Sequence, residues 1–465
     1  MKNTQEQELI ISSLPYFGKI TRINAFAGTG KTSTLVKLAE SYPEYRFLYL
    51  AFNRSIAQEA QRRFPSNTTS MTTHKLAYSH VVKVGDKVRG EYKVMEIMKI
   101  FSITLHNARV VKQIFSIFCS SIFITMKELK NYLKEIEVKV DDIHFFYAHK
   151  LYGMMVKRLI PITHDFYLKE YQRKREKNIS FDFIMLDEGQ DSNAVTIDIF
   201  RSLPGKKIII GDTHQQIYSF RGSVDAMQSL KAEKEFNLTE TFRCRPAIVK
   251  MANYILSTYK NEKKKLVAAH KDISDVETIA YITRTNASLI DYINEFDEFR
   301  LTRKPSEIFK CSLSIYYRLT GEYKQIHPEY KYLISMNDDE LQEYIRSSAD
   351  IEIESSNEIV GKFKDKLPIL YKKALNQKKM STLTLSTAHS SKGLEFDAVV
   401  LSNDFPSLEN IKSNVRISQI SKDNEYNLLY VAVTRARYAI MNNSPNVFSD
   451  TASDYFLKSL FQENS

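Results

Sequence analysis

The 465-residue chain contains no tryptophan and only three cysteines, and it has no apolar run long enough to cross a membrane. Cys119, Cys244 and Cys311 lie far apart without a C-x-x-C pair, which supports neither a disulfide framework nor a zinc site and favours a reducing cytosol. The most apolar run, residues 114–126, is interrupted by serines and predicts a core helix. The start, "MKNTQEQELI", is too polar for a signal peptide, so no membrane partner is expected.

The charge is unbalanced. Lys and Arg number 66 against 55 Asp and Glu, giving a formal net charge of +11. Such an excess favours a polyanionic partner, nucleic acid first and an acidic membrane surface second. A merely soluble basic enzyme is the alternative, and charge alone does not choose between them. The length predicts two to four domains or subdomains.

Short apolar runs followed by turn residues recur along the chain, and helix-like stretches separate many of them. They are residues 20–26, 47–52, 181–187, 206–212, 277–284, 382–388 and 397–403. This alternation predicts an α/β fold with parallel sheets, whose active loops follow the carboxyl ends of the strands. Residues 80–178 and 300–378 break the pattern with charged amphipathic stretches and are expected to be helical insertions. Most of their lysines are expected on solvated helix faces.

The segment "AFAGTGKT" (25–32) lies between an expected strand and an expected helix and predicts a P-loop, although Ala25 replaces the usual first glycine. Gly28 and Gly30 allow backbone N–H groups to turn toward phosphate oxygens. Lys31 is expected to reach the β- and γ-phosphates, and the Thr32 hydroxyl to ligate Mg²⁺. The segment therefore predicts nucleotide binding, without choosing among kinase, GTPase, ATPase and motor.

A second segment, "IMLDEGQD" (184–191), closes another apolar strand. Asp187 suits a Mg²⁺ carboxylate, and Glu188 suits a general base that polarises the attacking water. A strand-end Asp-Glu pair can also be structural, but beside a P-loop it favours hydrolysis. Arg243 and Arg435 are candidates to stabilise charge on a γ-phosphate, although a single arginine is more often a surface ion pair.

The order of the motifs resembles that of superfamily 1A DNA helicases of the UvrD/Rep type, and the wording of the early ones is similar to the F-box DNA helicase branch. The matching segments are "TQEQ" (4–7), "AFAGTGKT" (25–32), "YLAFNRSIAQEA" (49–60), "MTTHKLAY" (71–78), "LDEGQD" (186–191), "GDTHQQIYSFRG" (211–222), "LTETFRCRPAIV" (238–249), "ITRTNA" (282–287), "STAHSSKGLEFD" (386–397) and "LLYVAVTRAR" (428–437). The resemblance reaches nearly end to end.

The resemblance implies two RecA-like parallel-sheet domains, 1A and 2A, which clasp ATP between them and carry helical insertions. The implied boundaries are 1–79 and 179–245 for 1A, 80–178 for subdomain 1B, 246–299 and 379–465 for 2A, and 300–378 for a small subdomain 2B. Because 2B is short, translocation along one strand is a safer expectation than processive unwinding.

The same resemblance implies the residues of an ATP site. Gln7 would read the adenine, Phe242 would stack on it and Glu395 would contact the ribose. The implied loop residues are Ala27, Gly28, Thr29, Gly30, Lys31, Thr32 and Ser33. The implied catalytic set is Lys31, Glu188, Gln215, Arg243 and Arg435, with Thr32 and Asp187 at Mg²⁺. Gly189 stands where alanine or a larger residue is usual, and glycine is expected to add backbone freedom beside Glu188.

The implied DNA contacts are Phe52, Asn53, His74, Tyr78, Phe220 and His389. Core packing remains an alternative for Phe52 and Tyr78. Metal binding by the two histidines has no support from Cys, His or carboxylate spacing. Phe220 stands where the family often has a base-stacking tryptophan, and stacking is worth about 1–3 kcal/mol per base.

These features predict an ATP-dependent translocase or helicase on single-stranded DNA and single–double-strand junctions, moving 3′→5′ by analogy. One alternative is a partner-gated, DNA-stimulated ATPase that remodels protein–DNA complexes or licenses a nuclease or other effector, with little unwinding. Another is a DNA-binding scaffold whose ATPase has decayed, against which the intact catalytic set argues.

Overall fold

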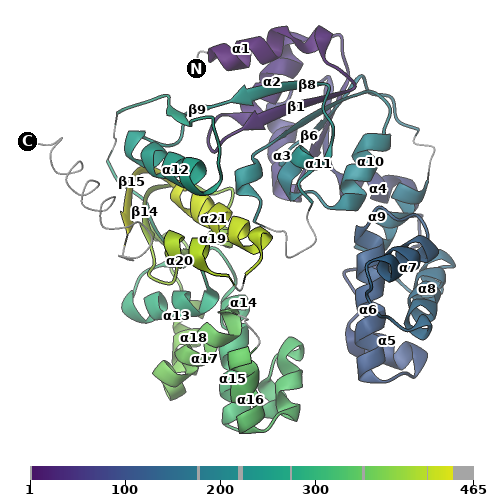
Figure 1. Cartoon of the computed structure of the whole chain (residues 1–465), viewed down its shortest axis with the longest axis vertical. Helices are drawn as coiled ribbons and strands as arrows, with labels where there is room; N and C mark the ends of the chain where they lie inside the picture. The colour runs from purple at the N-terminus through teal and green to yellow at the C-terminus, as the bar shows by residue number, and fades with distance from the viewer. Residues whose placement is uncertain are drawn as a thin grey trace, which may run out of the picture. The chain divides into compact units, whose positions relative to one another are not determined.

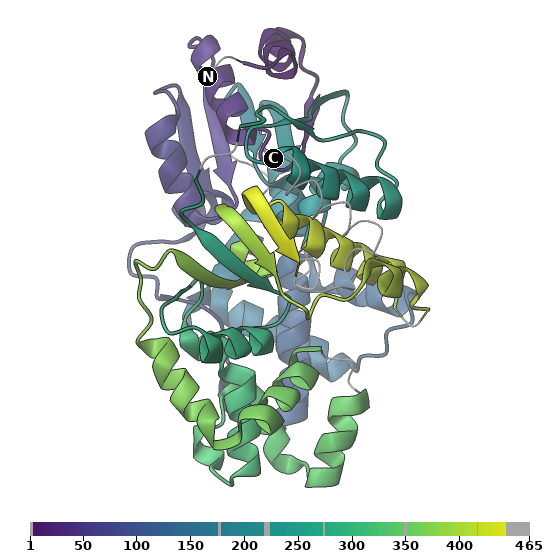
Figure 2. The same cartoon turned by 90° about the vertical axis from the view of Figure 1, so that its left-hand side faces the viewer.

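The computed structural model describes residues 3–174, 178–217, 224–272, 275–347, 351–415 and 417–442 (Figures 1 and 2). The chain divides into two compact units. Unit 1 comprises Met1–Phe26 and Gly30–Leu238, and unit 2 comprises Ala27–Thr29 and Thr239–Ser465.

Unit 1 contains a six-stranded parallel sheet in the order β3-β2-β6-β7-β1-β8. Its strands are β1 (Ile20–Ala25), β2 (Phe47–Ala51), β3 (Thr68–Thr72), β6 (Phe183–Leu186), β7 (Lys206–Gly211) and β8 (Lys234–Leu238). The central strands are continuously apolar because both faces of the sheet are covered, as is usual for parallel sheets. Alternate side chains of β2 enter opposite cores, with Leu48 and Leu50 on one face and Phe47 and Tyr49 on the other.

Helices cover both faces of this sheet. They are α1 (Gln5–Ser12), α2 (Lys31–Ser41), α3 (Arg54–Arg63), α4 (Thr73–Val81), α9 (His164–Arg173), α10 (Ala194–Ser202) and α11 (Ala226–Ser229). Short 3-10 turns η1 (Leu14–Tyr16), η2 (Gly189–Asp191) and η3 (Thr213–Gln215) follow α1, β6 and β7. The last two turns hold polar side chains at the carboxyl ends of their strands.

The short strands β4 (Val88–Arg89) and β5 (Ile162–Thr163) pair with each other, and four helices come between them in the sequence (Figure 1). These helices are α5 (Val94–Phe101), α6 (Leu105–Ser120), α7 (Met126–Glu135) and α8 (Asp142–Val156). Their apolar side chains form one continuous core with α9 and one face of the sheet. The group falls within the stretch predicted as subdomain 1B.

The predicted core helix over 114–126 is only partly correct. Helix α6 ends at Ser120, and α7 begins at Met126. Thr125 caps α7 by accepting from the Glu128 N–H, while the Glu128 carboxylate accepts from the Thr125 N–H. This reciprocal pair is a strong helix start, so it divides the apolar run into two helices.

Unit 2 contains a five-stranded parallel sheet in the order β12-β13-β11-β14-β15. Its strands are β11 (Ile279–Thr283), β12 (Arg300–Leu301), β13 (Leu383–Thr387), β14 (Phe396–Leu401) and β15 (Ala436–Asn442), and a separate pair is β9 (Glu240–Thr241) with β10 (Val267–Ala268). The helices are α12 (Pro246–Tyr259), α13 (Asn286–Glu295), α14 (Pro305–Ile308), α15 (Lys310–Leu319), α16 (Asp338–Ser347), α17 (Ile351–Phe363), α18 (Leu367–Leu375), α19 (Ala388–Ser391), α20 (Leu408–Ser413) and α21 (Gln419–Val433), with 3-10 turns η5 (Tyr323–Gln325), η6 (Pro328–Ser335) and η7 (Lys364–Lys366). Helices α14–α18 gather together in both views and share a core with α13 and β13 (Figures 1 and 2).

The predicted α/β class with parallel sheets is confirmed, and each of the seven apolar runs contains a strand. Strands β3, β8, β12 and β15 were not among those runs. The boundaries of 1A, 1B, 2A and 2B remain a prediction, because contacts group each helical insertion with its neighbouring sheet. Within the described part of the chain, no helix is long and apolar enough to cross a membrane.

Candidate active site

Polar segments follow the strands of the unit 1 sheet at its carboxyl edge. Strand β1 leads into the P-loop, and β2 into Phe52 and Asn53. Strand β6 leads into Asp187, and β7 into Asp212. Because the strands are parallel, these segments share one edge, which is where open α/β sheets bind ligands.

The P-loop has the backbone that phosphate binding requires. Gly28 and Gly30 adopt positive φ angles of 72° and 79°, which glycine tolerates far better than other residues. Gly30 is the N-cap of α2, so the N-terminal N–H groups of that helix face the loop. Ala25, the exception to the glycine pattern, is the buried last residue of β1, in register with Leu238. A side chain is therefore accommodated there.

The outer P-loop residues have structural surroundings. Ala27 and Thr29 are buried, and the Ala27 N–H donates to the Tyr430 hydroxyl. The Ser33 hydroxyl accepts a hydrogen bond of 2.9 Å from Arg63.

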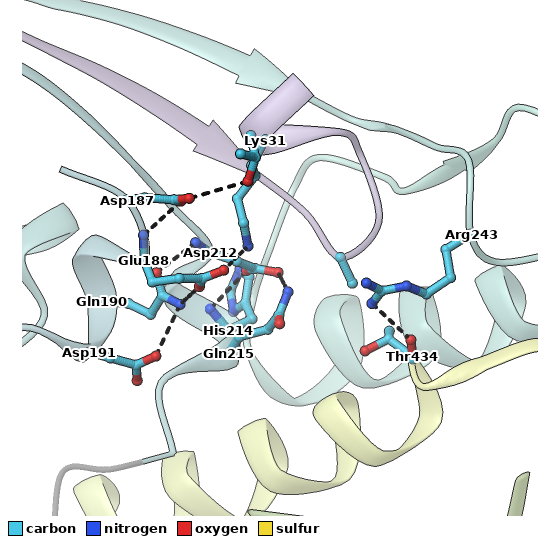
Figure 3. Close-up of polar contacts among 12 residues, drawn as sticks. Lys31, Asp187, Glu188, Gln190, Asp191, Asp212, His214, Gln215, Arg243 and Thr434 are labelled. Carbon is cyan, nitrogen blue, oxygen red and sulfur yellow. Dashed lines mark hydrogen bonds and ion pairs between the residues drawn. The ribbon is translucent and has the colours of Figure 1, made fainter. Parts of the chain in front are cut away.

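Lys31 is surrounded by acidic side chains. Its ammonium pairs with the Glu188 carboxylate at 3.1 Å (Figure 3). Burial by itself would lower the pKa of Lys31, but the charges of Glu188 and of two nearby aspartates outweigh it and raise that pKa. Lys31 is therefore a fixed cation at the start of α2, as a ligand for phosphate oxygens must be.

Asp187 is held by three donors. The Thr32 hydroxyl donates at 3.3 Å and the Glu188 N–H at 2.8 Å, and the Tyr49 hydroxyl donates a third hydrogen bond. Burial and the charge of Glu188 raise the pKa of the Asp187 carboxyl, while Lys31 and Tyr49 oppose that rise.

The Thr32 and Asp187 oxygens fit Mg²⁺. Magnesium prefers oxygen donors and takes few protein ligands while it keeps several waters. Because the Thr32 hydroxyl gives its hydrogen to Asp187, its oxygen lone pairs are left to face a cation. The described residues contain no cluster of three or more His, Cys, Asp or Glu that could hold a metal without a nucleotide.

Glu188, Gln190, Asp212 and Gln215 form a hydrogen-bonded series (Figure 3). The Gln215 amide donates to Asp212 at 2.8 Å and is buried. The expected loosening effect of Gly189 is not what the packing shows. A Cβ at Gly189 would lie 2.7 Å from the Ile209 side chain, so glycine here permits close packing of η2 on β7.

Gln7 has a local role in addition to the one expected for it. Its side-chain oxygen accepts from the Thr4 N–H, and its backbone N–H donates to the Thr4 hydroxyl, so the pair closes the N-terminus of α1. The Gln7 amide also donates to the Thr34 hydroxyl of α2 at 3.1 Å. Gln7 thus ties α1 to the helix that follows the P-loop.

In unit 2, two expected ATP-site residues are paired. The Arg243 guanidinium donates to the Glu395 carboxylate at 2.9 Å. It also donates to the Thr434 carbonyl at 3.3 Å (Figure 3). Arg437 also pairs with Glu395, at 2.5 Å. Burial would raise the pKa of Glu395, but the two arginines outweigh it and hold that pKa below its usual range. Glu395 therefore fixes two cations in addition to its expected ribose contact.

Arg435 is fully buried at the end of α21. Its guanidinium donates to the carbonyls of Val431 and Leu394 at 3.0 and 3.1 Å. The Phe242 ring is half-buried, with its centroid 6.0 Å from that of His270.

Two of the expected DNA residues line a cavity of about 460 Å³ in unit 1. His74 and Tyr78 lie there with Arg54 and Lys75, and the Tyr167 ring of α9 forms part of the wall. The rings of His74 and Tyr78 meet Tyr167 edge-on, at centroid distances of 6.0 and 5.6 Å. Burial lowers the pKa of His74, so its imidazole is neutral near pH 7.

Phe52, Asn53 and His389 are not among the residues that line this cavity. Phe52 is 44% exposed, and Asn53 caps α3 by accepting from the Ile56 N–H at 2.9 Å. His389 lies in α19 of unit 2. Phe220 lies outside the described residues, so its expected stacking remains a prediction.

Sequence reasoning missed residues that the structure brings to these sites. Tyr49 and Gln190 contact the two carboxylates, and Arg54, His164 and Tyr167 line the cavity. A tyrosine in a fully buried strand, beside residues expected at a nucleotide, was the available signal for Tyr49. No sequence signal pointed to Tyr167, because its ring partners His74 and Tyr78 lie about 90 residues earlier.

The parallel sheets, the P-loop and the strand-end carboxylates define a P-loop nucleotide-binding protein. The family model of the UvrD-like helicase C-terminal domain matches residues 292–441, and an AAA domain model matches residues 10–221. The match to the UvrD-like helicase C-terminal domain agrees with the resemblance that the motif order predicted.

The chain is similar to F-box DNA helicase 1 of Gallus gallus, with 29% identity over 98% of this chain and 51% of that protein. It is also similar to F-box DNA helicase protein 1 of Schizosaccharomyces pombe, with 27% identity over 95% of this chain and 57% of that protein. The chain thus spans about half the length of the curated relatives it matches.

Proposed function

We propose that this chain is an ATP-driven motor that translocates on single-stranded DNA, 3′→5′, and separates strands at duplex junctions. The observation that carries the proposal is the group around Lys31. A P-loop lysine, a Mg²⁺-type hydroxyl–carboxylate pair and the adjacent Glu188 meet at one sheet edge. Together with the family relationship, this group supports hydrolysis of ATP.

Each side chain has a role that follows from its chemistry. Lys31 would bind the β- and γ-phosphates, and Glu188 would orient and polarise the attacking water. Mg²⁺, held through Thr32 and Asp187, would neutralise charge on the β- and γ-phosphate oxygens. Gln215 would face the γ-phosphate, and Arg243 and Arg435 would stabilise the charge that develops there.

The nucleotide itself would be held by groups that the resemblance assigns. Gln7 would read the adenine edge, Phe242 would stack on the base, and Glu395 would contact the ribose. The P-loop backbone from Ala27 to Ser33 would enclose the phosphates.

The cavity beside α4 supports a DNA surface on unit 1. Arg54 and Lys75 bring positive charge, while Tyr78 is 47% exposed and can offer a ring face to a base. Lys75→Ala should therefore weaken single-stranded DNA binding and reduce its salt dependence by about one phosphate contact. Lys99→Ala, on exposed α5 away from the cavity, is the matched control and should change neither.

The deciding experiment is steady-state ATP hydrolysis with and without single-stranded DNA, beside Lys31→Ala and Glu188→Gln. We expect strong stimulation of the wild-type chain by DNA and loss of turnover in both variants. Turnover that is independent of DNA, or that survives both substitutions, would refute a DNA motor.

Strand separation and protein displacement distinguish the motor from the partner-gated alternative. We expect the chain to unwind a duplex carrying a 3′ single-stranded tail, and not one carrying a 5′ tail. Displacement of a bound protein without strand separation would favour the remodelling ATPase, whose nuclease or effector would then be a separate partner.

A further inference from the structure

Gln190 follows the expected general base and is completely buried. Its side-chain N–H donates to the Glu188 carboxylate at 2.5 Å and points also to Asp191, at 3.4 Å. Its side-chain oxygen accepts from the backbone N–H of Asp212 at 3.0 Å (Figure 3). One amide therefore joins the turn after β6 to the turn after β7.

Two glycines fix the amide in this place. A Cβ at Gly211 would lie 2.3 Å from the Gln190 side-chain oxygen and 3.1 Å from the Gly189 nitrogen. A Cβ at Gly189 would meet Ile209. The two turns thus pack at a distance that only glycine allows, and the Gln190 amide fills the space between them.

Glu188 needs such support. It adopts the left-handed conformation with φ of 51°, which costs a non-glycine residue free energy unless its surroundings impose it. Lys31 also holds the Glu188 carboxylate, but phosphate oxygens would compete for that ammonium when a nucleotide binds. Gln190 donates from within the turn that carries Glu188, so this hydrogen bond does not depend on the state of the P-loop.

The other end of the series reaches Gln215. Asp212, whose N–H is fixed by Gln190, accepts a hydrogen bond of 2.8 Å from the Gln215 amide. A shift of either turn would therefore move both the Glu188 carboxylate and the Gln215 amide.

We propose that Gln190 is a positioning residue that holds the Glu188 carboxylate for attack by water and sets the turn that carries Gln215. This inference rests on the proposed ATPase function and deepens it. Gln190 touches neither nucleotide nor DNA in this role, because it acts through Glu188 and Asp212.

The test compares Gln190→Met and Gln190→Glu in the full chain. Methionine keeps the length of the side chain and removes both hydrogen bonds. Glutamate keeps an acceptor for the Asp212 N–H but replaces the donor to Glu188 with a second negative charge. We expect kcat to fall about 10–100-fold in both, since hydrogen bonds to charged groups are of that strength. The KM for ATP and the Kd of a non-hydrolysable analogue should change less than about twofold.

Gln172→Met is the matched control. Gln172 is also buried, its amide donates to the Asp198 carboxylate at 2.8 Å, and its oxygen accepts from Lys169 at 2.7 Å. It lies in α9, away from the P-loop, so its loss should lower Tm without changing kcat more than about twofold. A kcat for Gln190→Met that falls no further than that of Gln172→Met overturns the proposal.

The outcomes separate this inference from the proposed function. Wild-type turnover that is lost in Glu188→Gln but retained in Gln190→Met leaves the function standing and overturns the inference. Absence of wild-type turnover overturns the function. In that case a double-mutant cycle of Glu188→Ala with Gln190→Met, measured by urea unfolding, tests the interaction between the two side chains. A coupling energy near zero overturns the inference.

Discussion

Lys31 and Lys169 of unit 1 have surroundings that give them opposite properties. Lys31 at the P-loop faces carboxylates, which raise its pKa. Lys169 in α9 faces neutral oxygens, the Ser121 carbonyl at 3.0 Å and the Gln172 amide at 2.7 Å, and lies 4.5 Å from the centre of the Phe118 ring. Burial lowers the pKa of Lys169 to about 8. The same residue type is therefore held as a cation among carboxylates in one region and is packed among neutral groups in the other.

The difference lies in which elements supply the neighbours. The neighbours of Lys31 come from the carboxyl ends of parallel strands, which bring polar residues together at one edge of the sheet. Around Lys169 they come from a helix end and a helix face in the core shared with α5–α8. We expect substitutions in the first region to change chemistry and those in the second to change stability.

The largest expected effect comes from replacing each lysine with methionine. Lys31→Met should reduce ATP turnover about 10³-fold, because it removes the cation expected at the phosphates and leaves Glu188 without its ion pair. Lys169→Met should keep turnover within about twofold. DNA-stimulated phosphate release by both purified variants checks this, and equal losses would contradict the division between the two regions.

The sequence was enough to predict the P-loop, the Asp187–Glu188 pair and the seven strands, because each depends on local pattern. It could not predict the polar edge strand β3, "TTSMT", whose strand conformation comes from pairing with β2. Tyr49 and Gln190 were missed for a related reason. Their partners are defined by the register of β2, β6 and β7, so their roles exist only in the folded sheet.

The next effect concerns stability against pH. Lys169 has a pKa of about 8 when folded and an ordinary value of 10.5 when unfolded. Between these values the unfolded chain binds a proton that the folded chain does not, so this lysine makes unfolding free energy rise with pH. The charges of Cys119, Arg173, Asp198 and Glu128 also act on the Lys169 ammonium, and these residues remain in the variant.

The predicted quantity is the free energy of unfolding of the wild type minus that of Lys169→Met. This difference should be about 2 kcal/mol larger at pH 10 than at pH 7. Urea unfolding at both pH values measures this difference. A difference that stays constant with pH would show that the ammonium is better compensated by its oxygens than its burial implies.

A pair of tyrosines extends the comparison. Tyr49 donates to Asp187 in the Lys31 region, and Tyr152 donates to Glu170 in the Lys169 region. Burial, then the charge of the accepting carboxylate, raises the pKa of each phenol, so both stay protonated donors. Tyr49→Phe should raise the Mg²⁺ concentration needed for nucleotide binding about tenfold, because partners of metal ligands tune metal affinity.

Tyr152→Phe is the control and should leave the Mg²⁺ requirement unchanged. Calorimetric titration of an ATP analogue at several Mg²⁺ concentrations measures both variants without turnover. An unchanged requirement in Tyr49→Phe would mean that the Thr32 and Glu188 donors alone hold Asp187.

The smallest expected effect comes from two glycines, one in each region. Gly189→Ala places a Cβ against Ile209 and should lower the free energy of unfolding by at least about 1 kcal/mol, as overpacking usually does. Gly153 lies inside α8 with no atom within 4 Å of an added Cβ. Gly153→Ala should therefore raise the free energy of unfolding by about 0.5–1 kcal/mol, since alanine favours helix. Urea unfolding of both variants measures whether each substitution raises or lowers the free energy of unfolding. A stabilising Gly189→Ala would show that η2 can move away from β7 at no cost.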